Sequence, residues 1–112
     1  MSWFPAFLFT QAFEVPIYLA VMDRQRVPFS PASQVAIAFG ASALTHPIVW
    51  FVIPKLGLSY TGYVALAEVF AVGAEALYFA RLGVQRALLW AFVANATSAS
   101  LGLLSRSMFG WP

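Results

Sequence analysis

Four long apolar stretches dominate this sequence and constrain its fold more than any other feature. They run from about residue 3 to 22, 32 to 54, 63 to 80 and 84 to 104. A bilayer core about 30 Å thick needs ~20 mostly apolar residues per helix. Of the 112 residues, 62% are hydrophobic and 9% are charged, whereas a soluble domain is typically about 45–50% apolar and about 25% charged. We therefore expect an integral membrane protein.

All four stretches are expected to be α-helices, because a helix satisfies its backbone polar groups within the segment where lipid offers no partner. Transmembrane strands would be shorter and would alternate in hydrophobicity. The breaks are DRQRVPFSP (residues 23–31), PKLGLSYTG (residues 54–62) and the very short Arg81-Leu82-Gly83. The prediction is an all-α, polytopic membrane protein. Residues 1–112 form one domain of two tandem helical hairpins, the second of them tight.

Composition excludes several classes of protein. The chain has no Cys, which excludes disulfide frameworks, iron–sulfur clusters and zinc fingers. The basic residues lie in separate loops rather than along one stripe, so we expect no nucleic-acid partner. The first ten residues, MSWFPAFLFT, lack a positively charged region and a small-residue cleavage site, so no cleavable signal peptide is expected.

The basic residues also predict an orientation in the membrane. The first and third loops share one side, and its basic residues are Arg24, Arg26, Arg81 and Arg86. Lys55 and Arg106 lie on the other side. The positive-inside rule then places the first and third loops in the cytoplasm and both termini outside, in a bacterial-type inner membrane. The bias is small, so a dual topology stays open as an alternative.

The two predicted hairpins are similar in sequence. AFGASA (residues 38–43) aligns with AFVANA (residues 91–96), and Glu14 with Tyr18 has a counterpart in Glu75 with Tyr78. This alignment predicts an internal duplication. Each hairpin would carry a carboxylate on its first helix and small and polar residues on its second. Two hairpins that point the same way form a parallel repeat, as in some transporters. The alternative is a chance match between two Ala-rich membrane helices.

Three of the four acidic residues fall inside predicted spans: Glu14, Glu68 and Glu75. No Lys or Arg lies at a matching depth. A charge at the bilayer centre costs on the order of 2.5–3.5 kcal/mol even on lenient scales, so such residues face the protein interior and are protonated, hydrogen-bonded or bound to a cation. Glu68 and Glu75 lie two helical turns apart, about 10 Å along one face.

Each predicted span carries a polar face, and these faces meet at comparable depth if the bundle closes. The combined candidate set is Gln11, Glu14, Tyr18, Ser42, Thr45, His46, Glu68, Glu75, Asn95 and Ser98. Pro47 follows His46 and removes a helical hydrogen bond, which is expected to free a carbonyl as an additional ligand.

We interpret this set as a site for a proton or a cation. Desolvation favours the neutral form of a carboxylic acid, and a cation that displaces its proton becomes a coupled co-substrate. His46 with Glu68 and Glu75 is a weaker candidate for a divalent metal, since imidazole and carboxylate suit Zn or Mn. No pair of ligands has a diagnostic metal-binding spacing, and the sequence identifies no cofactor.

Other interpretations stay open. Buried Ser, Thr and Asn often only join helices together, and His46 can donate to a carbonyl or a Glu. No G-x-S-x-G elbow accompanies Ser98, so we do not expect an enzyme. The leading prediction is a small transporter or channel-like module. The alternative is a non-catalytic subunit of a larger membrane complex. Lipid is the expected surrounding in both cases, with either a homo-oligomer or a larger complex as the assembly.

In size and layout the chain is similar to the small multidrug resistance transporters, which are also short, have four helices and carry a Glu in the first span, as Glu14 does here. The similarity ends at that layout. The residues around Glu14 follow a different pattern, and the His46-Pro47 step, Glu68 and Glu75 are foreign to that family. The four-helix fluoride channels are similar only in size. The sequence therefore supports no family assignment, and both similarities are analogies at the level of fold.

Overall fold

A computed structural model describes residues 2–112. Residues 2–112 form four α-helices: α1 (Trp3–Gln25), α2 (Pro31–Phe51), α3 (Tyr60–Arg81) and α4 (Ala87–Phe109). One short 3-10 helix, η1 (Ile53–Leu56), follows α2. All four α-helices are long and apolar enough to cross a membrane. The prediction of an all-α protein with four candidate spans is confirmed.

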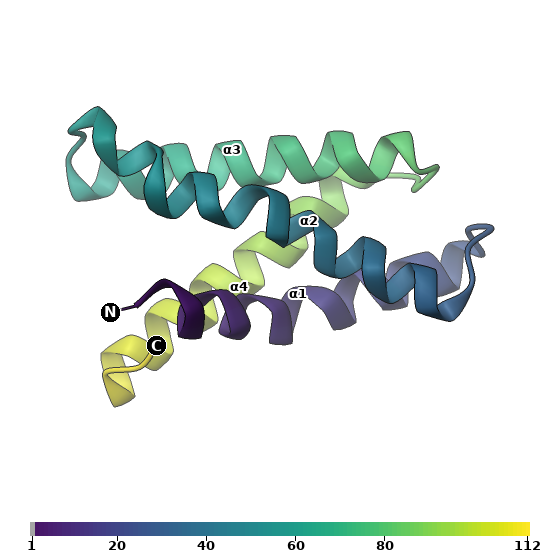
Figure 1. Cartoon of the computed structure of the whole chain (residues 1–112), viewed down its shortest axis with the longest axis horizontal. Coiled ribbons are helices and arrows are strands. Elements are labelled where there is room, and N and C mark those ends of the chain that lie inside the picture. The colour runs from purple at the N-terminus through teal and green to yellow at the C-terminus, as the bar shows by residue number, and fades with distance from the viewer. Residues whose placement is uncertain (1) are drawn as a thin grey trace.

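The helices form a ring in which each packs against two neighbours, in the order α1, α2, α3, α4 and back to α1 (Figure 1). Helices α1 and α3 face each other across the centre, as do α2 and α4. Both termini and the α2–α3 connection lie at one end, which we call the terminal end (Figure 1). The other two connections lie at the opposite end, the turn end.

Serine caps set the starts of two helices. Ser30 Oγ accepts a hydrogen bond from the Ser33 backbone N–H at 3.2 Å, and Pro31 occupies the first turn of α2. Ser59 Oγ accepts from the Gly62 N–H at 3.1 Å at the start of α3. Such caps satisfy backbone donors that a helix leaves unpaired. Both caps lie within the segments that the sequence marks as turns.

The third connection is longer than predicted. It extends from Leu82 to Arg86, and α4 begins at Ala87 rather than near residue 84. The Gln25 side chain supplies the hydrogen bonds that a helix would have made: its Nε2 donates to the Gln85 carbonyl at 2.9 Å, and its Oε1 accepts from the Gln85 N–H at 2.7 Å. The side chain of Val84 is buried inside the turn.

Small residues face the centre of the bundle and large apolar residues face outward. The buried alanines of the central helix faces are Ala38, Ala41, Ala67, Ala71, Ala91 and Ala94. The exposed large residues include Leu44, Val69, Leu77, Leu88 and Phe92. Small residues allow membrane helices to approach closely, and lipid provides the solvent for the outer faces. This distribution fits a bundle surrounded by a bilayer.

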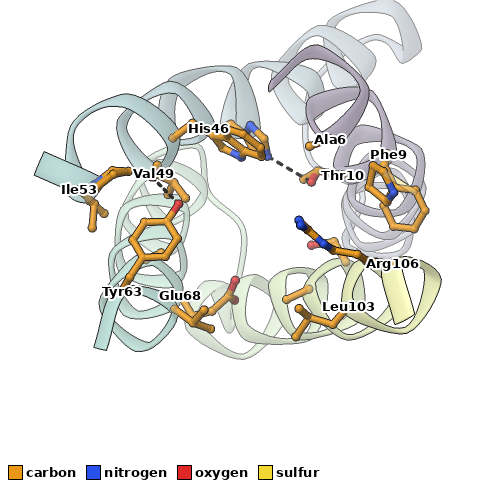
Figure 2. A pocket seen from close by; sticks show the side chains of 18 of the residues that line it. Ala6, Phe9, Thr10, His46, Val49, Ile53, Tyr63, Glu68, Leu103 and Arg106 are labelled. Carbon is orange, nitrogen blue, oxygen red and sulfur yellow. Dashed lines mark hydrogen bonds between the residues drawn. The ribbon is translucent and has the colours of Figure 1, made fainter. Parts of the chain in front are cut away.

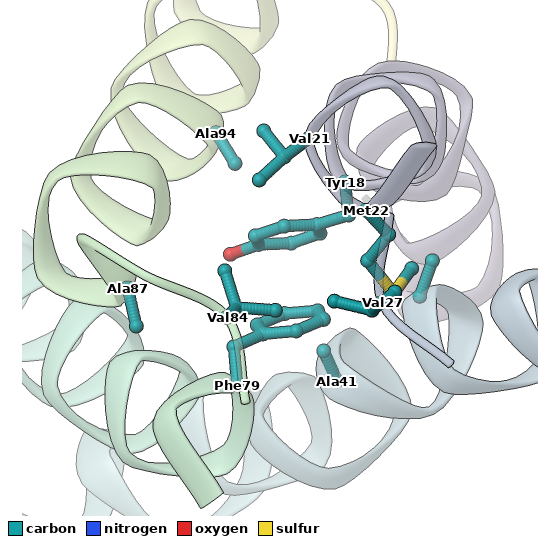
Figure 3. Packing of buried hydrophobic residues seen from close by; sticks show 10 residues of the cluster. Tyr18, Val21, Met22, Val27, Ala41, Phe79, Val84, Ala87 and Ala94 are labelled. Carbon is teal, nitrogen blue, oxygen red and sulfur yellow. The ribbon is translucent and has the colours of Figure 1, made fainter. Parts of the chain in front are cut away.

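A cluster of larger side chains fills the centre of the bundle at the turn end. Tyr18 and Phe79 lie with ring centroids 4.1 Å apart, and Met22, Val27 and Val84 pack around them (Figure 3). All five side chains are buried. We refer to these five residues as the plug, because they occupy the bundle axis between the polar centre and the turn end.

Candidate functional site

Two carboxyl groups meet at the centre of the bundle. Glu14 comes from α1 and Glu75 from α3, and each side chain is only 1% exposed. The two groups lie close enough for their charges to interact. We refer to them as the carboxyl pair. Their position opposite each other explains why acids far apart in sequence form one site.

Hydroxyl groups from both neighbouring helices donate to Glu14. Ser42 Oγ, on α2, donates to Glu14 Oε1 at 2.6 Å. Ser98 Oγ, on α4, donates to Oε2 at 2.5 Å. Ser98 Oγ also lies 3.2 Å from the Asn95 carbonyl of its own helix, a second acceptor for the same hydroxyl.

Glu75 has three donors. Tyr18 Oη donates to Glu75 Oε1 at 2.6 Å, and Asn95 Nδ2 donates to the same oxygen at 3.1 Å. Thr45 Oγ1 donates to Oε2 at 2.9 Å. All four helices therefore contribute a side chain to the carboxyl pair or its shell. Seven of the ten residues predicted from sequence meet in this cluster: Glu14, Tyr18, Ser42, Thr45, Glu75, Asn95 and Ser98.

The donors follow the predicted duplication. In the alignment of residues 38–43 with 91–96, Ser42 corresponds to Asn95, and continuing the register pairs Thr45 with Ser98. Ser42 and Ser98 donate to Glu14, whereas their counterparts Asn95 and Thr45 donate to Glu75. The buried residues of α2 are Ala38, Ala41, Ser42 and Thr45, and their aligned positions in α4 are buried too. These relations support a two-fold repeat around the bundle axis.

One element of the predicted repeat is wrong. Tyr78 was expected to be the counterpart of Tyr18, but it lies three residues after Glu75, whereas Tyr18 lies four after Glu14. Tyr78 Oη instead donates to the Ile37 carbonyl on α2 at 2.9 Å. Phe79 is the position equivalent to Tyr18, and it is buried against the Tyr18 ring. A shift of one residue on a helix moves a side chain about 100° around the axis.

Two connected cavities surround the site. An inner pocket of about 170 Å³ encloses the carboxyl pair. An outer cavity of about 730 Å³ lies toward the terminal end and is lined by all four helices and η1 (Figure 2). Thr10, His46, Glu68 and Ser98 line both. The outer cavity therefore adjoins the inner pocket on the side of the terminal end.

His46 and Glu68 form part of the cavity wall rather than the carboxyl pair. Both are half-buried and point into the outer cavity (Figure 2). His46 Nε2 lies 3.3 Å from Thr10 Oγ1, and its ring packs among Phe7 and Trp50. His46 Nδ1 is buried without a hydrogen-bond partner.

Two expectations in this region need correction. The metal candidate made of His46, Glu68 and Glu75 does not form: among residues 2–112, no three side chains of His, Cys, Asp or Glu lie close enough to hold one ion. Glu75 is bonded to donors on three other helices, away from His46. Gln11 lines neither cavity, and its Nε2 donates to the Phe39 carbonyl at 3.0 Å. It joins α1 to α2.

Thr10 and Trp50 were not among the predicted site residues, although both line the two cavities. Each lies one helical turn from a residue that was predicted, since Thr10 precedes Glu14 and Trp50 follows His46 at a spacing of four. That spacing places them on the same helix faces. Arg106, also missed, lines the outer cavity only.

The fold and the site together define a small four-helix bundle with membrane-spanning helices and a central acidic site. Within the described part of the chain, no Lys or Arg lines the inner pocket. No protein-family model, curated protein or solved structure matches the chain. The function is therefore inferred from the residues of the site and their chemistry.

Proposed function

We propose that the chain is a small membrane transport module in which Glu14 and Glu75 together hold one proton and exchange it for a small cation. The observation that carries this proposal is the carboxyl pair: two buried acids close to each other, with hydroxyl and amide donors but no Lys or Arg among the described residues that line the inner pocket. Two adjacent carboxylates in a buried site repel each other unless a proton or another cation lies between them.

The cavities supply a route to this site. The outer cavity lies toward the terminal end and shares lining residues with the inner pocket that holds the carboxyl pair, and the plug fills the bundle axis on the other side. A cation and a proton reach the pair from the terminal end in this conformation. Release at the turn end requires the plug to move. With the terminal end outside and the first and third loops in the cytoplasm, this is the outward-facing state.

The origin of the donors favours a self-contained site over a subunit of a larger complex. Tyr18, Ser42, Thr45, Asn95 and Ser98 of this chain donate to the carboxyl pair, and both acids are buried inside the bundle. A subunit that used these acids to hold a partner would direct them at its outer surface. Glu14 and Glu75 instead face each other across the bundle axis.

Reconstitution into liposomes tests the proposal. With a pH-sensitive dye trapped inside, a gradient of Na⁺ or K⁺ is imposed across vesicles that contain the protein. We expect a cation-driven change of internal pH that Glu14→Gln and Glu75→Gln abolish. Asp23→Asn is the matched control, because it also removes one carboxylate but lies exposed at the end of α1. No cation-driven change, or one that survives in both Gln variants, contradicts the proposal.

A further inference from the structure

The two acids of the carboxyl pair have unequal hydrogen-bond shells, although the hairpins that carry them are related by a repeat. We infer that Glu14 carries the exchangeable proton on Oε2 and that Tyr18 is a positioning residue that keeps Glu75 charged. This inference rests on the proposed function, because it assigns the proton of that site to one residue.

Glu75 Oε1 accepts from two groups, the Asn95 amide and the Tyr18 phenol. The Asn95 amide nitrogen has two hydrogens, and it donates one to the Ala91 carbonyl at 2.8 Å and the other to Glu75 at 3.1 Å. Tyr18 Oη, on a side chain only 2% exposed, donates to Glu75 at 2.6 Å. Hydrogen bonds donated to a carboxylate stabilise its charged form.

Asn95 and Tyr18 both differ from their counterparts in the other hairpin, and both differences favour Glu75. The counterpart of Asn95 is Ser42, which gives Glu14 a single hydroxyl donor at Oε1. The counterpart of Tyr18 is Phe79, which has no hydroxyl to give. Glu14 therefore lacks both the amide and the phenol that Glu75 has. The charge is better stabilised on Glu75.

Ser98 completes the assignment. Its hydroxyl lies 2.5 Å from Glu14 Oε2 and 3.2 Å from the Asn95 carbonyl. When Glu14 is protonated, Oε2 donates to Ser98 Oγ, and Ser98 in turn donates to the carbonyl. Thr45 has a similar second acceptor, the Ala41 carbonyl at 3.3 Å, but it lies farther from its carboxylate, at 2.9 Å.

Exchange then follows a balanced sequence. The O–H bond at Glu14 Oε2 breaks, and the proton passes to water that enters the inner pocket. The Ser98 hydroxyl turns from the Asn95 carbonyl to donate to Oε2. A monovalent cation binds between the two carboxylates, so the carboxyl pair and its bound ion carry one negative charge before and after. The other titratable side chains that face the pair or its pocket are Tyr18 from α1, His46 from α2 and Glu68 from α3; α4 contributes only neutral groups.

Infrared spectroscopy tests the assignment through the carbonyl stretch of a protonated carboxylic acid. In an Asp23→Asn, Glu68→Gln background, Glu14 and Glu75 are the only acidic side chains left of four. We expect a protonated-acid band that disappears in Glu14→Gln and persists in Glu75→Gln. Loss of the band in Glu75→Gln, alone or in both variants, overturns the assignment. Absence of the band from the background itself overturns the proposed function as well, which separates the two failures.

A second set of variants keeps both acids in place. Ser98→Ala removes the acceptor of the Glu14 proton and should shift the band, whereas Thr45→Val should leave it unmoved. Tyr18→Phe should add a second protonated-acid band from Glu75. Tyr78→Phe is its control, because it removes a half-buried tyrosine hydroxyl that donates to the Ile37 carbonyl and lies outside the carboxyl pair. A band shift with Thr45→Val but not with Ser98→Ala, or equal spectra of the two Tyr variants, contradicts the inference.

Discussion

Tyr18 links the carboxyl pair to the plug: its hydroxyl donates to Glu75 at 2.6 Å while its ring packs against Phe79, with centroids 4.1 Å apart and planes tilted by 30°. One side chain therefore touches both the charged site and the group that closes the turn end. Any change in the hydrogen bonding of Glu75 acts directly on a residue of the plug.

Truncation of the plug should uncouple transport. Phe79→Ala removes one of the two packed rings, which leaves a cavity between the inner pocket and the turn end. We expect a proton leak that needs no cation gradient, measured as dye acidification in liposomes under a pH gradient alone. A buried Phe→Ala change also costs about 3–5 kcal/mol of stability in soluble proteins, so the folded fraction must be measured alongside.

The control for this variant is Leu77→Ala, which truncates an outward-facing residue two positions earlier on the same helix. It should leave proton flux at the level of the unmodified protein. Equal leak rates for Phe79→Ala and Leu77→Ala would show that the plug does not separate the carboxyl pair from the turn end.

Access to the carboxyl pair should be one-sided. The chain has no Cys, so single cysteines can be introduced without background labelling. Ala99→Cys lines both cavities and should react with a water-soluble thiol reagent added at the terminal end. Val84→Cys, within the plug, should stay unreactive from both ends. Rapid labelling at residue 84, or none at residue 99, contradicts the assigned route.

Exposed positions test the orientation in the same way. Lys55→Cys lies at the terminal end and Gln85→Cys at the turn end, and both residues are exposed. With the proposed topology, an impermeant reagent added to intact cells labels residue 55 but not residue 85. Labelling of both in one preparation indicates dual topology, and labelling of residue 85 alone reverses the orientation.

Close packing between α2 and α3 depends on Gly40. A Cβ at this position would lie 3.1 Å from Tyr78 Oη, which is tighter than an ordinary contact. Gly40→Ala should therefore disturb the hydrogen bond to Ile37 and cost about 1 kcal/mol, the net value of one such bond. In a Tyr78→Phe background the cost of Gly40→Ala should largely disappear, because the clashing oxygen is absent.

Gly73→Ala provides the comparison, since a Cβ there meets no atom within 4 Å. Thermal unfolding in detergent should show a lower midpoint for Gly40→Ala and an unchanged or higher one for Gly73→Ala. The same loss in both variants would mean that helix backbone effects, not the contact with Tyr78, govern this position.

The repeat makes a prediction of its own. The double variant Ser42→Asn, Asn95→Ser exchanges two residues that occupy equivalent positions in the two hairpins. We expect it to assemble like the unmodified protein, with the amide donor moved from Glu75 to Glu14. Ser42→Asn alone places two amides in a 170 Å³ pocket and should be less stable than the double variant, as measured by thermal unfolding. The opposite order of stability contradicts the equivalence.

The sequence was sufficient to predict most of the fold because lipid imposes a simple requirement. Only helices satisfy the backbone across runs of apolar residues, so the four spans follow from length and composition. The ends were less predictable. The turn at residues 82–86 depends on a contact between Gln85 and Gln25, which are 60 positions apart. No local sequence pattern predicts that contact.

The site was predictable in membership but not in arrangement. The prediction grouped these residues because they lie at similar depths in their spans: Glu14, Glu75, Ser42, Thr45, Asn95 and Ser98. The order of the helices around the ring determines which donor bonds to which acid. The residue spacing within a single helix does not predict that order. The pairing of Tyr18 with Phe79 depends on a difference of one residue in helix phase, which the weak alignment did not resolve.

We propose that the carboxyl pair holds one proton that a cation displaces. The most direct test counts protons released when Na⁺ or K⁺ is added to the purified protein in weakly buffered detergent solution. We predict release of about one proton per chain from the unmodified protein and from Asp23→Asn, and none from Glu14→Gln, since the pair has a single exchangeable proton. No release from the unmodified protein, or equal release from Glu14→Gln, would contradict the account.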